Sequence, residues 1–338
     1  YPTKLTIICD LDGTLLPKPY KNESGVLCNP CLEEGAAFSP IKHLLEEGGT
    51  IYGVTGSKIT SHKPRFWDNI PLAARVEGRA LLFCETGMAL YRSDDKGEPV
   101  EDEKYGPFPG NTKRYLAIET VNTFVERARK GVRQWFADLR DNPSLLDSKH
   151  FLHSLAARWA DEDAPLTHDP KQTPRIEVRG DTSDTVVGVM VAGVPIQFGD
   201  KYLTPCLEPG EIEGVPTGRL CFDAVVPGLN KQLVLDWLVR EQVVDLHAGA
   251  TVCFGDSPAG NDAGLAAYHN NGIPFISVCE HDKKVPEFLV PCHVGHNEKG
   301  SGVAIGRLTA LQHQASGRQA IVDLRTIKTL ASAARSTL

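Results

Sequence analysis

The sequence predicts an α/β protein that has a Rossmann-like core built on a parallel sheet and an α+β domain inserted into that core. Short apolar runs rich in β-branched residues recur along the chain, and each of them stops at a polar turn. Helical patterns lie between these runs, as expected where crossover helices join parallel strands. The middle of the chain differs, because it is richer in proline, charge and tryptophan. We therefore expect a core made of two separated segments, with a second domain between them.

Four apolar runs predict the strands of the core sheet. They are residues Lys4–Cys9, Thr50–Val54, Thr251–Phe254 and Ile273–Val278. Short continuous apolar runs are typical of parallel strands that are covered on both faces. In such sheets the polar loops at the carboxyl ends of the strands form the functional site. The residues that directly follow these runs are therefore the first candidates for chemistry.

Two amphipathic helices are predicted between the core strands. The first is expected to have Ser39 as its cap and Pro40 at its first position, and to end at Gly48–Gly49. The second begins at Lys231. Its apolar face is predicted to consist of Leu233, Val234, Trp237 and Leu238. Helices of this kind are the elements that cover a parallel sheet.

The chain is predicted to divide into a discontinuous core, an insert and a polar tail. The core is 1–91 and 222–312, the insert is 92–221 and the tail is 313–338. Within the insert, helical patterns near 112–139 and 148–160 precede strand-like runs at 175–179 and 185–192. This mixture of helices followed by strands predicts an α+β insert.

Composition and charge restrict the partners that this chain can have. The 338 residues are 41% hydrophobic and carry a formal net charge of −7, without the clustered Lys and Arg of a nucleic-acid-binding surface. No apolar run approaches the roughly 20 residues that cross a bilayer. We expect neither a nucleic-acid partner nor a membrane span, and the composition indicates no particular oligomeric state. The 9 cysteines, several of them within apolar runs, favour a reducing compartment and hence a cytoplasmic location.

Two carboxylates directly follow the first predicted strand, in the motif Asp10-Leu-Asp12-Gly-Thr14. Closely spaced negative charges repel one another and favour a bound cation. Magnesium is the natural choice, because it prefers oxygen ligands and keeps several of its waters. One carboxylate can then bind the ion and attack phosphorus, while the other handles the proton of the leaving group. An acidic turn without a chemical role is the alternative interpretation of this motif taken alone.

A second acidic motif, Gly255-Asp256-Ser257, follows the strand predicted at Thr251–Phe254. Asn261 and Asp262 come a few residues later in the same loop. If this strand lies beside the first strand of the chain, Asp256 approaches Asp10 and completes a shell of oxygen ligands. A polar turn of this composition is common in loops, so the prediction depends on the two motifs taken together.

Two smaller features fit the same site. The hydroxyl groups of Thr55-Gly56-Ser57, which follow the strand at Thr50–Val54, can hydrogen-bond a phosphate oxygen. Lys231 stands at the start of a predicted helix, where the helix dipole disfavours a cation. A nearby carboxylate or phosphoryl group would compensate this unfavourable position. Taken alone, a Ser/Thr turn after a strand is more often an ordinary loop, and an exposed lysine is usually a solvated surface charge.

Together, these segments resemble the haloacid dehalogenase superfamily, and specifically its sugar-phosphatase branch with a large type-two cap. That branch includes Cof-type, sucrose-phosphate and mannosyl-3-phosphoglycerate phosphatases. The matching motifs are Asp10-x-Asp12-Gly-Thr14, Thr55-Gly56-Ser57, Lys231, and Gly255-Asp256-Ser257 with Asn261-Asp262. The resemblance covers about residues 1–92 and 222–312, and it implies that the insert between them is the cap domain.

The resemblance also implies roles for individual residues. Asp10 would form an aspartyl-phosphate, and Asp12 would first protonate the leaving group and then deprotonate the attacking water. Mg²⁺ would be held by Asp10, the main-chain carbonyl of Asp12, and Asp256. The phosphate would be bound by Thr55, Gly56, Ser57 and Lys231. Ser257, Asn261 and Asp262 would support the metal site or Lys231.

The predicted activity is that of a Mg²⁺-dependent phosphomonoesterase that acts on a small phosphate ester, by analogy a phosphorylated sugar or polyol. In the insert, Arg158, Trp159, Arg175 and Arg179 are candidates for substrate recognition. Pro258-Ala-Gly260 makes the last motif longer than is common in the superfamily and similar to its phosphomannomutase version. A phosphosugar mutase therefore remains the first alternative, and a non-catalytic sugar-phosphate sensor the second.

Overall fold

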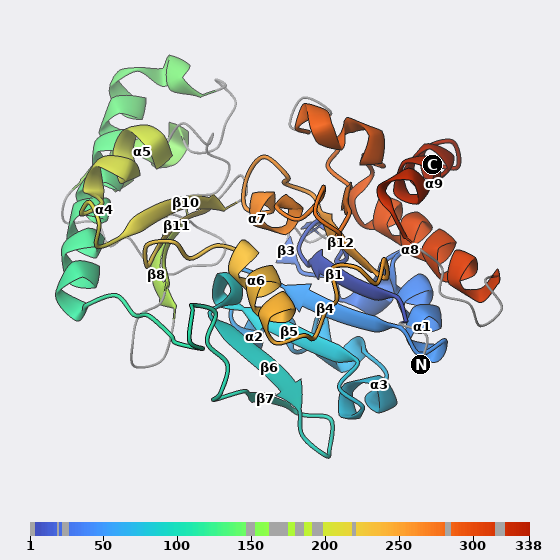
Figure 1. Cartoon of the computed structure of the whole chain (residues 1–338). Coiled ribbons are helices and arrows are strands. Elements are labelled where there is room, and N and C mark those ends of the chain that lie inside the picture. The colour runs from blue at the N-terminus through green and yellow to red at the C-terminus, as the bar shows by residue number, and fades with distance from the viewer. Residues whose placement is uncertain are drawn as a thin grey trace. The chain divides into compact units, whose positions relative to one another are not determined.

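The computed structural model divides into two compact units (Figure 1). We call Tyr1–Lys113 together with Leu229–Leu338 the core unit, and Arg114–Gly228 the inserted unit. The structure describes residues 4–18, 20–21, 27–146, 153–161, 175–179, 186–190, 199–217, 221–280, 285–314 and 322–338.

A seven-stranded sheet forms the centre of the core unit, in the order β13-β12-β1-β4-β5-β6-β7. The strands are β1 (Thr6–Asp10), β4 (Thr50–Val54), β5 (Ala80–Cys84), β6 (Ala89–Ser93), β7 (Pro99–Glu101), β12 (Thr251–Gly255) and β13 (Phe275–Ser277). From β13 to β5 all neighbours pair in parallel, and β6 and β7 extend the sheet in antiparallel fashion. The predicted α/β core with a parallel sheet is confirmed.

Helices cover both faces of this sheet (Figure 1). The side chains of β1 alternate between the two faces and so belong to two apolar layers. Ile7 and Cys9 belong to one layer and Ile8 to the other. The first layer also contains α1 (Phe38–Glu46), α8 (Asn297–Gln314) and α9 (Leu324–Arg335). The second contains α6 (Gln232–Arg240) and α7 (Ala263–Ala266). This double covering explains why the central strands are continuous apolar runs.

Shorter elements complete the core unit. They are β2 (Tyr20–Lys21), β3 (Leu27–Cys28), α2 (Ile59–His62), α3 (Leu72–Val76) and the 3₁₀ turns η1 (Leu32–Glu34), η2 (Trp67–Asn69), η3 (Glu85–Gly87) and η8 (Glu287–Cys292). Among the described residues, no helix combines the length and the apolar character that crossing a bilayer requires.

Two details of the predicted helices differ from the structure. Helix α1 begins at Phe38 with Ala37 as its N-cap, so Ser39 lies within the first turn and does not cap the helix. Pro40 is compatible with this position because N–H groups of the first turn have no partner inside the helix. In α6, the buried face contains Leu235 and the predicted Leu233 is only partly buried.

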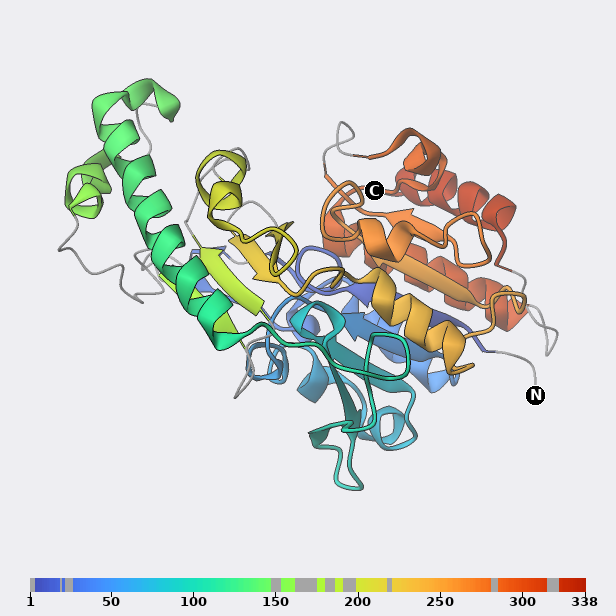
Figure 2. The same ribbon diagram turned by 60° about the vertical axis from the view of Figure 1, so that its left-hand side comes forward.

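The inserted unit combines two helices with a four-stranded antiparallel sheet of order β10-β11-β9-β8 (Figure 2). Its helices are α4 (Ile118–Asp141) and α5 (His153–Ala160), and its strands are β8 (Arg175–Arg179), β9 (Val186–Met190), β10 (Glu213–Thr217) and β11 (Cys221–Val225). The short elements are η4 (Pro143–Leu145), η5 (Gly199–Leu203) and η6 (Thr204–Cys206). Helix α4 contacts α5, β8 and β9. Its buried face, which includes Phe124, Val132 and Phe136, gives this unit its own apolar centre.

The unit boundaries differ from the predicted domain limits. The predicted insert begins within β6 and includes all of β7, but both strands pair in the core sheet. Conversely β11, which we placed in the core from residue 222, pairs with β9 and β10. Apolar periodicity identifies a strand, but the partner of that strand depends on contacts far away in the chain. The residues 313–338, expected as a polar tail, include α9, whose apolar side chains belong to the core.

Candidate active site

Three functional segments meet at one edge of the core sheet. Strand β1 lies between β4 and β12 and is parallel to both. Asp10 is the last residue of β1, Thr55 follows β4, and Asp256 follows β12. Because the carboxyl ends of parallel strands meet at the same edge, the pairing brings these residues together.

A buried cluster of charges lies at this edge. Asp10, Asp256 and Asp262 each offer a carboxylate oxygen, and these oxygens lie within 4.8 Å of one another. The Nζ of Lys231 lies 2.5 Å from Oδ1 of Asp10 and 2.7 Å from Oδ1 of Asp262. Lys231 is only 1% exposed and Asp262 is fully buried. The structure thus brings Asp10 and Asp256 together, and it places Asp262, expected only in a supporting role, within the same group.

Two glycines make this close approach possible. Gly13 has φ +85°, and a Cβ atom at this position would lie 2.5 Å from Oδ2 of Asp256. At Gly255, a Cβ atom would lie 2.6 Å from Oδ2 of Asp262. Both glycines belong to the motifs recognised in the sequence. Their role is to let a carboxylate from another segment approach the main chain.

The electrostatics of the cluster indicate an uncompensated negative charge. Burial raises the pKa of Asp10 well above its ordinary value; Lys231 opposes this, and Asp262 and Asp256 add to it. Burial and the neighbouring Asp262 raise the pKa of Asp256 to about 7. Burial lowers the pKa of Lys231, but Asp10 and Asp262 raise it by more, so the ammonium group stays charged.

One ammonium group cannot neutralise three carboxylates. A divalent cation would supply the missing charge, and a set of carboxylate oxygens is the donor set that Mg²⁺ prefers. The residues present therefore fit a magnesium ion, with Asp10 and Asp256 as the side chains available to hold it.

The side chain of Asp10 is held from two directions. Lys231 donates to its Oδ1, and the hydroxyl of Thr14 donates to its Oδ2 over 3.2 Å. Thr55, which is 2% exposed, accepts a hydrogen bond from the main-chain N–H of Ser57 over 3.1 Å. Because β1 and β4 pair in parallel up to Asp10 and Val54, the Thr55-Gly56-Ser57 turn lies beside the end of β1. A hydroxyl in this place still has its proton to donate to a ligand oxygen.

The loop after β12 holds Asp262 in place. The N–H of Ser257 donates to Oδ2 of Asp262 over 2.9 Å, and the N–H of Asp262 donates to the carbonyl of Ser257 over 3.1 Å. A turn from Ser257 to Gly260 accommodates the additional residues of this loop. The Oδ1 atom of Asn261 is buried without a hydrogen-bond partner among the described residues.

The carboxylate of Asp12 lies apart from the acids that could share one ion. Its Oδ2 lies 2.8 Å from Nε2 of His62, and its Oδ1 accepts a hydrogen bond of 2.8 Å from Nη1 of Arg65. Partial burial raises the pKa of Asp12, but the hydrogen bond to His62 and the charge of Arg65 lower it by more, to well below its ordinary value. Asp12 was expected at the metal through its main-chain carbonyl, and its side chain takes no part in the acidic cluster.

Sequence reasoning missed His62 and Arg65. Both follow the Thr55-Gly56-Ser57 turn, but neither belongs to a pattern with a recognisable chemical meaning. They reach Asp12 only because α2 and the residues after it fold back toward the end of β1.

The structure corrects the predicted role of Trp159, one of the candidates for substrate recognition in the insert. It is only 4% exposed, and its ring packs against Phe136 with centroids 4.9 Å apart. Trp159 is therefore part of the apolar centre of the inserted unit. The structure describes the main chain but not the side chains of Arg158, Arg175 and Arg179.

Solved structures of other proteins agree with this fold, whereas no protein-family model and no curated protein matches the chain. A haloacid dehalogenase-like hydrolase from Bacteroides thetaiotaomicron has 15% sequence identity and a TM-score of 0.51, and the match covers 90% of this chain and 100% of that one.

Two further solved structures are similar at lower TM-scores. The N-terminally truncated IMP-nucleotidase of Plasmodium falciparum is 12% identical, with a TM-score of 0.49 and coverage of 90% and 71% of the two chains. The haloalkanoate-superfamily phosphatase BT1666 of Bacteroides thetaiotaomicron is 15% identical, with a TM-score of 0.47 and coverage of 92% and 94%. At such identities the likeness concerns the fold, and the chain has the fold of the haloacid dehalogenase-like hydrolases.

Proposed function

We propose that this chain is a Mg²⁺-dependent phosphomonoesterase of the haloacid dehalogenase superfamily and that it acts through an aspartyl-phosphate on Asp10. The main support is the buried group of Asp10, Asp256 and Asp262 around Lys231, at the carboxyl ends of β1 and β12. A cluster of this charge has no evident structural purpose, because buried carboxylates are costly unless they are paired. Strongly perturbed carboxylates that converge at one edge of a sheet are typical of catalytic sites.

In the first step, an oxygen of Asp10 attacks phosphorus and the ester P–O bond breaks. The departing alkoxide takes a proton from Asp12, which must carry that proton at this stage. Lys231 and Thr14 hold the two oxygens of Asp10 and so orient the attacking carboxylate. Thr55 and the ammonium group of Lys231 are the donors available to the phosphoryl oxygens.

In the second step, Asp12 accepts a proton from water, the water oxygen bonds to phosphorus, and the P–O bond to Asp10 breaks. Inorganic phosphate leaves and Asp10 is regenerated as a carboxylate, while Asp12 has regained the proton that it gave away. Asp10, Asp256 and the main-chain carbonyl of Asp12 are the groups that would hold Mg²⁺. When bound, the ion supplies positive charge to the phosphoryl oxygens.

The substrate that we propose is a phosphorylated sugar or polyol. This choice depends on the likeness of the motifs to the sugar-phosphatase branch and on the size of the insert, which we propose is the cap domain. A reducing compartment such as the cytoplasm is the proposed location. It is supported by the cysteines that the structure describes, most of which are buried in apolar surroundings.

The test is a screen of phosphorylated sugars, polyols and nucleotides for release of inorganic phosphate, with Mg²⁺ and with EDTA. We expect release only with Mg²⁺, and a loss of at least about 10³-fold in kcat for Asp10→Asn, because its amide cannot form the intermediate. Full turnover by this variant would contradict the covalent route. Isomerised sugar phosphate in place of free phosphate would identify a mutase, and binding without turnover would identify a sensor.

A further inference from the structure

Asp12 contacts two side chains of the core unit, His62 and Arg65, that have no role in the two proposed steps. His62 is the last residue of α2 and is 1% exposed, and the side chain of Arg65 is 14% exposed. Nε2 of His62 lies 2.8 Å from one oxygen of Asp12, and Nη1 of Arg65 lies 2.8 Å from the other. An ionised carboxylate only accepts hydrogen bonds, so both nitrogens act as donors.

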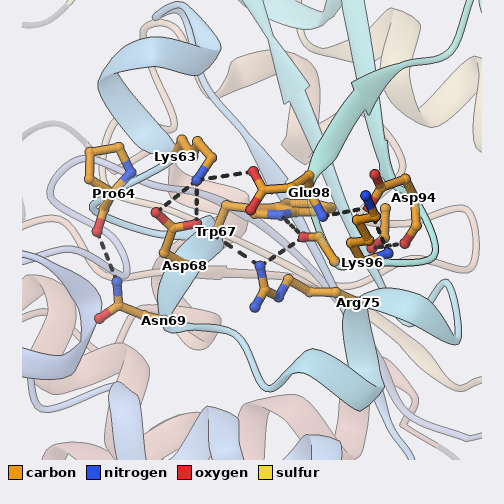
Figure 3. Close-up of polar contacts among 11 residues, drawn as sticks. Lys63, Pro64, Trp67, Asp68, Asn69, Arg75, Asp94, Lys96 and Glu98 are labelled. Atoms are coloured by element: carbon orange, nitrogen blue, oxygen red, sulfur yellow. Dashed lines mark hydrogen bonds and ion pairs between the residues drawn. The ribbon is translucent and has the colours of Figure 1, made fainter.

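The segment that carries His62 and Arg65 is firmly anchored (Figure 3). Lys63 pairs with Asp68 over 2.9 Å and with Glu98 over 3.3 Å. Nε1 of the fully buried Trp67 donates to the carbonyl of Gly97 over 2.9 Å. The ion pair between Lys63 and Asp68 lies within the segment, and the contacts with Glu98 and Gly97 attach the segment to the turn between β6 and β7.

The same carbonyl of Gly97 accepts a second hydrogen bond, of 2.8 Å, from Nη1 of Arg75 in α3 (Figure 3). The turn itself is closed by Asp94, whose Oδ1 accepts from the main-chain N–H groups of Lys96 and Glu98 over 2.9 and 2.8 Å. Both halves of the attachment are therefore ordered by polar contacts. A rigid support of this kind is what a positioning residue requires.

The hydrogen bonding of the pair is incomplete in a way that stability alone does not explain. Nδ1 of His62 and Nη2 of Arg65 are buried and have no hydrogen-bond partner among the described residues. Buried polar atoms are normally paired, and exceptions call for a specific reason. Apart from Asp12, the described contact of the Arg65 side chain is a hydrogen bond of 3.2 Å from Nε to the carbonyl of Pro30. Both oxygens of Asp12 thus accept hydrogen bonds, whereas His62 and Arg65 each keep one buried nitrogen without a partner among the described residues.

We propose that His62 and Arg65 are positioning residues that set the direction of the Asp12 carboxylate for its acid–base role. The inference rests on the proposed phosphatase function. Each oxygen of Asp12 accepts one hydrogen bond from the pair and keeps a second lone pair. The Asp12 side chain is 44% exposed, so a water molecule or a leaving oxygen can reach it. A base that is oriented by further groups is a recurrent arrangement in covalent catalysis.

The experiment compares variants that keep or remove the donor groups. His62→Gln and Arg65→Lys keep an N–H donor, whereas His62→Leu and Arg65→Met remove it at similar side-chain size. Arg79→Met is the matched control, since Arg79 also donates to main-chain carbonyls, those of Leu45 and Gly49, but does not contact Asp12. Each protein is assayed with Mg²⁺ on two aryl esters, p-nitrophenyl phosphate and phenyl phosphate.

The two esters differ in the proton that their leaving groups need. Phenolate is the more basic leaving group, so its departure depends more on an acid. We expect His62→Leu and Arg65→Met to lose about 10²-fold in kcat on phenyl phosphate and about 10-fold on p-nitrophenyl phosphate, with KM changed less than about threefold. His62→Gln and Arg65→Lys should recover about tenfold of the loss.

A second measurement separates positioning from a general structural defect. Because a misplaced base slows attack by water, p-nitrophenolate should be released in a burst by His62→Leu as the aspartyl-phosphate accumulates. Binding of beryllium fluoride with Mg²⁺, followed by ¹⁹F NMR, should stay as in the wild type, since Asp10 is untouched.

Equal losses on both esters, losses no larger than in Arg79→Met, or an increase in kcat would each overturn the positioning role. If the wild type releases no phosphate from any ester with Mg²⁺, the proposed function itself fails and the inference falls with it. If the wild type is active and all four variants match it, only the inference fails.

Discussion

At the scale of single residues, the cluster around Asp10 behaves as one charged unit. Three carboxylates lie within 4.8 Å of one another, and Lys231 supplies one compensating charge. Its neighbour Asp12 is ionised for a different reason, because His62 and Arg65 donate to both of its oxygens. Acids two residues apart in the chain therefore have opposite shifts in pKa. The raised pKa makes Asp10 dependent on a cation for its charge, whereas the lowered pKa keeps Asp12 as a carboxylate that can accept a proton from water.

The pKa of Asp256, raised to about 7, predicts how the metal-free protein responds to pH. An unfolded chain loses this proton near pH 4, so between about pH 4 and pH 7 the folded state binds more protons. The stability contributed by this group is present below that window and is lost as the pH rises through about 7. We expect the Tm of the protein in EDTA to fall between pH 5.5 and pH 8.

Mg²⁺ binding should show the opposite dependence, because the ion competes with the proton on Asp256. The dissociation constant, measured by calorimetry, should be about tenfold larger at pH 6 than at pH 8. Asp256→Asn should bind the ion weakly at both values, whereas Asp95→Asn, an exposed acid outside the cluster, should behave as the wild type. Equal affinity at pH 6 and pH 8 would show that Asp256 is not a ligand.

Gly13→Ala tests whether the close approach of Asp256 matters. The new Cβ atom would lie 2.5 Å from Oδ2 of Asp256, in a residue whose φ is +85°. We expect at least a tenfold loss of Mg²⁺ affinity and of kcat, together with about 1–2 kcal/mol of stability lost to the backbone conformation. Affinity and activity are measured by calorimetry and phosphate release, and stability by urea unfolding.

Gly78→Ala is the matched control for this substitution. Gly78 has φ +73°, but nothing lies within 4 Å of a Cβ atom built there. It should lose a similar amount of stability and keep its activity and Mg²⁺ affinity. If both variants retain activity, Asp256 and the first motif do not need their observed proximity.

At the scale of elements, the strands that carry the site were predictable, because each is an apolar run followed by a polar turn. Thr50–Val54 agrees with β4 residue for residue, and β1 and β12 each end one residue after the predicted last residue. The side-chain direction of Asp12 was not predictable. It depends on His62 and Arg65, and these reach Asp12 only through the folding of a segment some 50 residues away.

Two other features were unpredictable for a related reason. The assignment of β7 and β11 to different units depends on which strand each one pairs with, and the local sequence does not contain that information. Asp262 was recognised as part of a motif. The turn after Ser257 buries Asp262 fully beside Lys231, and the sequence of the lengthened loop did not predict that turn.

The attachment of η2 to the β6–β7 turn predicts a specific effect of Trp67→Phe. The substitution removes the hydrogen bond from Nε1 to the carbonyl of Gly97 and leaves that carbonyl with Arg75 alone. We expect a loss of about 1 kcal/mol beyond the change in ring size. Because the segment also carries His62 and Arg65, kcat on phenyl phosphate should fall, but less than in His62→Leu.

Trp237→Phe provides the comparison for the change in ring size. Trp237 is also buried in the core unit, but its Nε1 has no hydrogen-bond partner among the described residues. The difference between the two variants in urea unfolding therefore measures the hydrogen bond to Gly97. An equal loss of stability in both variants would mean that this bond contributes nothing to the attachment.

At the scale of the whole molecule, the core unit is closed by segments from opposite ends of the chain. The N–H of Leu5, just before β1, donates to the side chain of Gln312 over 3.3 Å. The N–H of Val322 donates to the carbonyl of Gly249 over 2.6 Å, just before β12. Helix α9 then packs against α8, and Ile327 and Leu330 are buried in the same apolar layer as Ile7 of β1. The strands that carry Asp10 and Asp256 thus depend on the last residues of the chain.

The double substitution Ile327→Ala with Leu330→Ala tests this dependence. Each side chain lies in the core with at most 4% exposed surface, and each large-to-small change should cost about 2–5 kcal/mol. We expect a lower urea midpoint for the whole core unit and a parallel loss of Mg²⁺ affinity on heating, although neither residue touches the site. Lys328→Ala, an exposed position in the same helix, should leave both unchanged. An unaltered midpoint in the double variant would mean that α9 is an appendage, and that the strands around Asp10 are stable without it.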